Sequence, residues 1–244
     1  MHRFVTLMVV LSLGLLTAAC VAPVPTSPDF KPLIVGVIDK GNAAPFLAGQ
    51  AFPVADLSLD ASRSPGLGGT VVNVSWSQLE PTPGRYDFST LDASLAAVSA
   101  YDMTHPDTAL AVKLRVFGAN GAPVWAKTLA GTPITITANG SIRGTVGQWW
   151  KPDYRAAWAG LQAVLAYRYD NNPLVHEVAV SSCSSLTAEP FVMSPAPSNV
   201  AQLLADGWTN SAQQACLDGA FADYAPWRGL AYSFYAWRPD TPET

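Results

Sequence analysis

Five short apolar runs occur along the chain, and segments with helical periodicity lie between them. The runs span residues 33–38, 70–76, 110–117 and 174–182, with a weaker one at 229–237. Each run is too short for a typical helix and is rich in β-branched or aromatic side chains, which favour strands. Strands that alternate with helices predict βα units and a parallel sheet.

The segment between the second and third runs has the pattern of an amphipathic helix. Leu91, Leu95 and Val98 recur at helical spacing and would share one face. Ser89 precedes them as a candidate N-cap, and Asp92 follows three residues after it. We therefore predict a helix that is capped by Ser89 and packs its apolar face on the sheet.

Two more helices are predicted between the third run and the last. Residues 199–221 should be helical with a break near Gly207. An earlier stripe of large apolar side chains ends before a loop signal at 171–173, and we expect it to belong to the core. Its members are Tyr154, Trp158, Leu161 and Leu165.

Residues 133–146 differ from these helical patterns. Two alternating runs flank Asn139-Gly140 in this segment. Asn-Gly between alternating runs is the strongest short-range signal for a β-hairpin. We predict a hairpin near residues 133–147, inserted in the loop after the third strand.

The first twenty residues have the order of an export signal. Arg3 supplies a positive charge, residues 4–16 form an apolar stretch too short to span a bilayer comfortably, and 16–20 read Leu-Thr-Ala-Ala-Cys. This last stretch resembles the lipobox of bacterial lipoproteins. The resemblance implies cleavage that leaves Cys20 as a lipid-anchored N-terminus in the cell envelope. An ordinary secretory signal cut near Ala19 is the alternative.

This interpretation divides the chain into three parts. Residues 1–19 would be the signal peptide, and 20–32 a tether with four prolines, a composition typical of stiff spacers. The domain would occupy residues 33–244. At about 200 residues it is long enough for one sizeable core.

Composition excludes several classes of function. The chain has 14 basic and 18 acidic residues and no basic run, which argues against a nucleic-acid partner. Its histidines are isolated, no Gly-x-Ser-x-Gly stretch occurs, and the glycines of residues 66–69 precede a strand instead of following one. We therefore predict no cofactor, no metal site and no serine hydrolase. Eight tryptophans fit a protein that stacks on sugars, and equally a large core.

Two cysteines would remain after lipidation of Cys20. Cys183 follows the fourth strand, and Cys216 lies in the last predicted helix. In an oxidising compartment they could form a disulfide. The alternative is two separate buried thiols.

Polar residues that close the apolar runs are the first candidates for chemistry, because a parallel barrel has its active site at the carboxyl ends of its strands. Asp39, Arg115 and Glu189 are in such positions, as is the stretch 76–80. Glu189 follows a run of small residues and precedes Pro190. A partly desolvated carboxyl there could have the raised pKa that a general acid needs.

Several of these stretches resemble the family 42 β-galactosidases and related barrel glycoside hydrolases. The resemblance covers roughly residues 33–237 and implies a (β/α)8 TIM-barrel type of α/β fold. It is strongest in the pattern W-x-x-L-E-P-x-x-G-x-Y-D-F-x-x-L-D, which residues 76–92 match. Other similar stretches are Lys113 to Gly118, Ala122 to Trp125, and Ala188-Glu189-Pro190.

The resemblance also implies roles for individual residues. Glu189 would be the catalytic acid/base, and Arg115 would support the carboxylates or a substrate oxygen. The sugar site would be walled by tryptophans, of which the 149–150 pair is the better stacking candidate and Trp76 the more structural one. Glu80 is expected to be structural. Ala188 stands where these enzymes usually have asparagine. The tryptophans concerned are Trp76, Trp125, Trp149 and Trp150.

A retaining glycosidase needs a second carboxylate about 5 Å from the first. The resembling families supply it from the seventh strand, whereas the sequence predicts five strands. We therefore expect an incomplete barrel of doubtful activity, with Asp39 as the one candidate for the second acid. The alternatives are a non-catalytic carbohydrate-binding lipoprotein and an inactive remnant.

Overall fold

The structure of the protein is a computed structural model that describes residues 30–41, 50–57, 66–138, 140–188, 192, 196–228 and 231–233. Cys20, the predicted signal peptide and most of the predicted tether lie outside these residues. Within them, no helix combines the length and the apolar character needed to cross a membrane.

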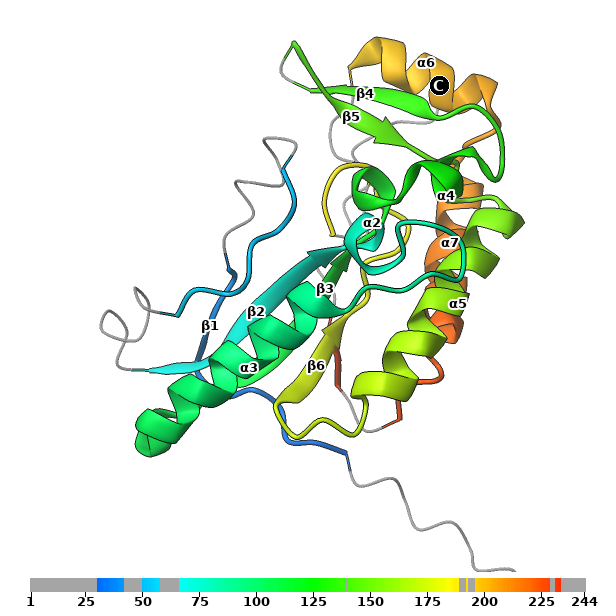
Figure 1. Ribbon diagram of the computed structural model, residues 1–244. Helices are drawn as coiled ribbons and strands as arrows, with labels where there is room; N and C mark the ends of the chain where they lie inside the picture. Colours follow the sequence, from blue (N-terminus) through cyan, green and yellow to red (C-terminus); the bar gives the residue numbers. More distant parts are fainter. Residues whose placement is uncertain are drawn as a thin grey trace, which may run out of the picture.

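The centre of the fold is a five-stranded parallel sheet, as the sequence predicts (Figure 1). Each strand pairs with the strand that follows it in the sheet order, which is also the chain order. This sequential order is that of a βα barrel and not of a doubly wound sheet, in which the order reverses. The strands are β1 (Val37–Asp39), β2 (Leu67–Ser75), β3 (Ala111–Phe117), β6 (Val175–Ala179) and β7 (Ala231–Ser233).

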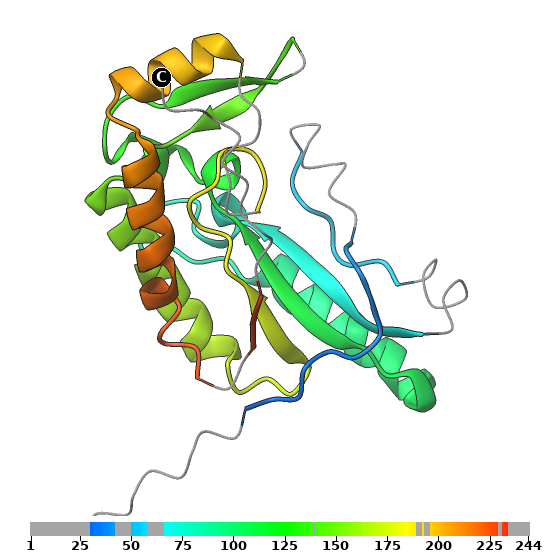
Figure 2. The same cartoon turned by 180° about the vertical axis from the view of Figure 1, so that it is seen from behind.

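Successive side chains of these strands point to opposite faces of the sheet. On β2 and β3, Val72, Val74, Val112, Leu114 and Val116 are at most 1% exposed and belong to the main core. This face packs on helices α3 (Ser89–Thr104) and α5 (Pro152–Tyr169), which lie along it in Figure 1. The alternate residues point to the other face, which carries no helix of the described residues in Figure 2.

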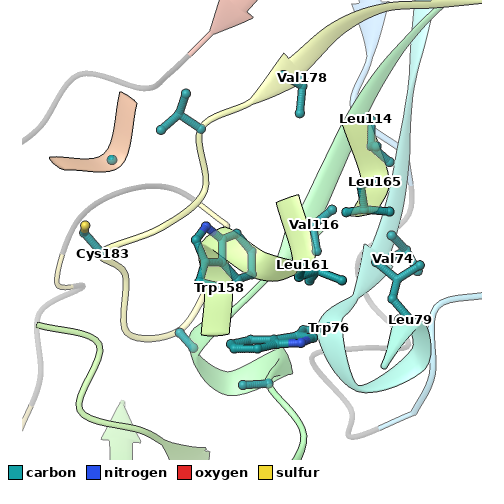
Figure 3. Close-up of a cluster of buried hydrophobic side chains, with 14 of the residues drawn as sticks. Val74, Trp76, Leu79, Leu114, Val116, Trp158, Leu161, Leu165, Val178 and Cys183 are labelled. Atoms are coloured by element: carbon teal, nitrogen blue, oxygen red, sulfur yellow. The ribbon is translucent and has the colours of Figure 1, made fainter. Parts of the chain in front are cut away.

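Trp76 joins the sheet to its helices. It begins the short helix α2 (Trp76–Leu79) and is fully buried. Its ring makes edge contacts with Trp125, Tyr154 and Trp158 at centroid distances of 5.5, 5.4 and 5.3 Å. Figure 3 shows Trp76 and Trp158 beside the apolar side chains of β2, β3 and α5. The predicted stripe of α5 is therefore core, as expected.

The predicted cap of α3 is wrong. Phe88 is the N-cap, and Ser89 is the first helical residue. Its backbone N–H donates to Asp87 Oδ1 at 2.9 Å, because a carboxylate reaches the amide two residues further along the chain. Hydrogen bonds from Ser89, first from its side chain and then from this N–H, lower the pKa of Asp87. The predicted apolar face is confirmed, since Leu91, Leu95 and Val98 are buried.

The predicted hairpin is confirmed. Strands β4 (Ile134–Ala138) and β5 (Ser141–Val146) pair antiparallel after the short helix α4 (Val124–Thr128). Gly140 adopts φ of 72°, which glycine accepts without steric cost. Asn199 of helix α6 (Pro197–Ala205) joins the hairpin, because its side chain accepts the N–H of Thr137 at 2.8 Å.

The last predicted helix is two helices with a break where expected. Helix α6 (Pro197–Ala205) ends before Gly207, which has φ of 85°, and helix α7 (Asn210–Asp223) follows. The disulfide is also confirmed: Cys183 pairs with Cys216 of α7. It joins the loop after β6 to α7, as expected.

Candidate active site

The inner face of the sheet, opposite α3 and α5, carries polar side chains in layers. The layer nearest the beginnings of the strands contains an ion pair between Lys113 Nζ and Glu177 Oε2 at 3.4 Å, on paired positions of β3 and β6. Both side chains are largely buried. They stand near the strand beginnings, so this pair is remote from the carboxyl ends where catalysis is expected.

Arg115 forms the next layer. It is 4% exposed, and its Nε donates to Asn73 Oδ1 at 2.7 Å on the neighbouring strand. Its Nη2 donates to the Lys40 carbonyl at 3.2 Å, and Asn73 Nδ2 donates to the same carbonyl at 3.1 Å. A buried guanidinium needs such partners. Arg115 is therefore a fixed positive charge at the centre of the inner face.

An apolar cluster at the carboxyl ends lies beyond Arg115. It consists of Phe52, Phe117 and Ala188, and all three are at most 3% exposed. The rings of Phe52 and Phe117 are 4.7 Å apart, and the Arg115 guanidinium lies 5.4 Å from the centre of the Phe117 ring. Gln78 fixes Phe52 by hydrogen bonds to both its N–H and its carbonyl.

Ala188 is the described residue next to the predicted acid/base. Glu189 and Pro190 themselves lie outside the described residues. The buried loop that leads to Ala188 is tied to α7 in two ways: by the disulfide, and by Gln213 Nε2, which donates to the Cys183 carbonyl at 2.7 Å. Gln213 and Cys216 are three residues apart and so lie on one side of α7.

Gln213 also determines where two indole rings lie. Its Oε1 accepts Trp149 Nε1 at 2.9 Å and Trp208 Nε1 at 3.2 Å. No pattern in the sequence marks this buried glutamine, because its partners are up to 64 residues away. It is the residue of this region that sequence reasoning missed.

The predicted sugar-stacking role of the 149–150 pair is not supported. Trp149 is 1% exposed and Trp150 is 9% exposed, and the two rings contact each other edge to face. Trp76 is also fully buried. The buried rings of Trp76, Trp149 and Trp150 cannot stack on a sugar. Trp125 is partly exposed, and its Nε1 donates to the Glu80 carbonyl at 3.1 Å, so its role in a sugar site stays a prediction.

Glu80 is structural, as expected. Its Oε2 accepts Trp76 Nε1 at 2.9 Å, and its Oε1 accepts the N–H of Gly84 at 2.8 Å. Asp92, at the end of the same motif, accepts hydrogen bonds from Arg168 and Tyr169 of α5. The motif therefore joins the first βα units, and Gln78 within it also holds Phe52 of the apolar cluster.

Asp39 lies at the end of β1 and lines a cleft of about 430 Å³. Its Oδ2 accepts the N–H of Gly41 at 2.9 Å. Phe52 and Asn73 also line this cleft, so it adjoins both Arg115 and the apolar cluster. Of the residues predicted for the site, the structure brings Asp39 and Arg115 into one neighbourhood.

Comparisons with solved structures find partial likenesses. Endo-glycoceramidase II from Rhodococcus sp. matches with a TM-score of 0.45 and 21% identity over 64% of this chain. A GH5_18 protein from Bifidobacterium longum subsp. longum matches with a TM-score of 0.42 and 15% identity, over 69% of this chain and 34% of its own. The β-galactosidase of Marinomonas ef1 matches with a TM-score of 0.30 and 28% identity, over 46% and 17%.

The chain spans 41% of the length of the Rhodococcus enzyme. A search of curated proteins found no match. The family model Glyco_hydro_42, described as beta-galactosidase, matches residues 63–190, which is more than half of the 244-residue chain. The protein therefore belongs to the Glyco_hydro_42 family of β-galactosidases.

Proposed function

We propose that this protein acts on β-linked glycans and that Glu189 is the proton donor to the leaving oxygen. The main support is the position of Ala188, the preceding residue. It is buried with Phe52 and Phe117 at the carboxyl end of the sheet, beyond Arg115. The family match extends to residue 190 and so includes Glu189.

The chemistry needs a carboxyl that stays protonated until the glycosidic bond breaks. An apolar neighbourhood raises the pKa of a carboxyl because it destabilises the charged form. Phe52, Phe117 and Ala188 would provide such surroundings near residue 189. Arg115, held by Asn73, would neutralise negative charge that develops on a second carboxylate or a substrate oxygen.

A retaining mechanism requires that second carboxylate about 5 Å away. Asp39 is the described carboxylate at a strand end that lines the cleft. Its Oδ2 accepts the N–H of Gly41 at 2.9 Å, and Asp39 is the first residue to test as that second carboxylate.

The test is hydrolysis of aryl β-galactosides, aryl β-glucosides and aryl α-arabinosides beside alkyl β-galactosides. Glu189→Gln should lower the rate on the alkyl substrates by about 10²- to 10⁴-fold, and much less on the aryl substrates, whose leaving groups need no proton. Asp218→Asn is the matched control, because this carboxylate is bonded to Gln214 on the exposed side of α7.

Two results would change this proposal. Equal rates for the parent chain and Glu189→Gln on alkyl substrates would remove Glu189 from its role. Unchanged activity of Asp39→Asn would show that Asp39 is not the second carboxylate of a retaining mechanism.

A non-catalytic carbohydrate-binding protein is the second candidate function. It is favoured by the cleft beside Asn73 and Arg115, which could bind sugar hydroxyls without a second carboxylate. Calorimetric titration beside the hydrolysis assay separates the two, because this candidate predicts binding of galactosides without turnover of any of them.

We also propose that the protein is exported and anchored to a membrane through Cys20. The support is the order of Arg3, the apolar stretch 4–16 and the Leu-Thr-Ala-Ala-Cys stretch. The disulfide agrees with an oxidising compartment. Incorporation of an acyl label at Cys20 is the direct test.

A further inference from the structure

The segment 30–37 lies across the ends at which the strands begin. Lys31 Nζ donates to the carbonyls of Asn172 and Val175 at 2.5 and 2.7 Å, just before and at the start of β6. The N–H of Ile34 donates to Glu177 Oε1 at 3.2 Å, and the N–H of Val37 donates to the Gly66 carbonyl at 2.8 Å. The end of the predicted tether is therefore bound to the domain.

Two glycines of β2 make room for this segment. A Cβ at Gly68 would lie 1.7 Å from the Val35 carbonyl oxygen, and a Cβ at Gly69 would lie 2.7 Å from the Ile34 side chain. No larger residue fits either position without movement of the backbone. We call residues 30–37 the strap. The glycines of residues 66–69, which do not form a nucleotide-binding loop, allow the strap to pass close to β2.

The strap exposes apolar side chains, although it is well bonded. Phe30 and Leu33 are 68% and 66% exposed, and Val35 and Val37 are 83% and 56% exposed. Charges of both signs lie at this end of the domain: Lys31 and Asp170 are close enough to interact, and Asp107 follows α3. The exposed apolar side chains are therefore the groups through which this surface would contact a lipid interface.

The opposite end of the domain carries the hairpin β4–β5 and the candidate active site. Figures 1 and 2 show the strap in blue at the ends where the strands begin, and the hairpin beyond the ends where they finish. The two ends are separated by the length of the strands. An anchor joined to the strap therefore lies on the side away from the site.

We propose that the strap turns the beginnings of the strands toward the membrane that holds Cys20, so that the candidate active site faces away from it. This inference rests on the proposed lipid anchor. Ten residue steps separate Cys20 from Phe30, which limits the tether to about 35 Å. A surface held so close to a bilayer is at a high effective concentration, so even a weak apolar contact sets its orientation.

The test couples residues 20–244 through Cys20 to a maleimide lipid in phosphatidylcholine vesicles. Cys183 and Cys216 do not compete for the maleimide, because they are bonded to each other. A fluorescent unnatural amino acid replaces Asp107 at the strap end or Ser141 in the hairpin, both of which are exposed. Energy transfer to acceptor lipids should be several-fold stronger from position 107.

Two variants separate orientation by the strap from orientation by chance. The double variant Phe30→Asp with Leu33→Asp should make the energy transfer from positions 107 and 141 nearly equal. Val124→Asp with Ile142→Asp is the matched control, because these side chains are 77% and 73% exposed elsewhere on the domain. This control should leave the difference unchanged.

Equal transfer from the two positions in the parent chain, or stronger transfer from position 141, would overturn the proposal. Self-association that disappears in Phe30→Asp with Leu33→Asp would also overturn it, because a second copy would then cover the strap. Chemical coupling makes the test independent of natural lipidation and of glycosidase activity. Whether Cys20 is lipidated in the cell is a separate question, which the incorporation of an acyl label at Cys20 answers.

Discussion

Replacement of Gln213 by methionine removes three buried hydrogen bonds with little change in side-chain volume. Two indole N–H groups, from Trp149 and Trp208, and the Cys183 carbonyl lose their partner. Gln213 is 1% exposed, so water does not replace it easily. Each buried group left unpaired costs about 1 to 3 kcal/mol. Neighbouring losses are not additive, so we expect a total of about 3 to 5 kcal/mol.

Urea unfolding followed by tryptophan fluorescence measures this change, because two of the affected groups are indoles. The matched control is Gln214→Met on the same helix, where the side chain is exposed and bonded to Asp218. The control should change the free energy of unfolding by less than about 0.5 kcal/mol. A loss below about 1 kcal/mol in Gln213→Met would refute the role of Gln213 in fixing the loop after β6.

Three further predictions concern the disulfide, the anchor and a buried lysine. Replacement of Cys183 and Cys216 by serine should lower the free energy of unfolding by roughly 3 to 4 kcal/mol, since the bond closes a loop of 33 residues; two free thiols in unreduced protein, detected by mass, would contradict this. Cys20→Ala should move the protein from the membrane fraction to the soluble fraction, and retention in the membrane fraction would argue against the anchor. Burial lowers the pKa of Lys127 to about 8, so the unfolded chain binds more protons above that pH and stability should rise between pH 8 and about 9.5. Lys127→Met should abolish this rise in urea unfolding at the two pH values.

The sheet, the hairpin and the disulfide could be predicted because their signals are local or few. Short apolar runs between helical segments locate the strands, and the strands of the sheet follow each other in chain order. Asn139-Gly140 marks the tight turn of the hairpin. Cys183 and Cys216 are the two cysteines outside the predicted lipobox, so each has the other as its candidate partner. These features depend on a few neighbouring residues and hardly on distant packing.

The errors arose where a distant partner or a competing neighbour decides the structure. Phe88 occupies the N-cap position, and Asp87 accepts the N–H of Ser89, so Ser89 begins the helix instead of capping it. Residues 33–36 looked like the start of a strand but belong to the strap, because Gly68 and Gly69 leave room for them beside β2, and β1 begins at Val37. Trp149 looked like a loop residue, yet Gln213 and the core bury it. Its burial could not be read from its own neighbours.

The most direct test is a crystal structure of the protein with an unreactive thio-β-galactoside. We predict that the sugar lies at the carboxyl ends of β1, β2, β3 and β6, beside the Arg115 layer, and that a carboxylate oxygen of Glu189 is within about 3.2 Å of the glycosidic sulfur. A galactoside bound at another surface of the domain, with Glu189 remote from it, would contradict the proposed active site.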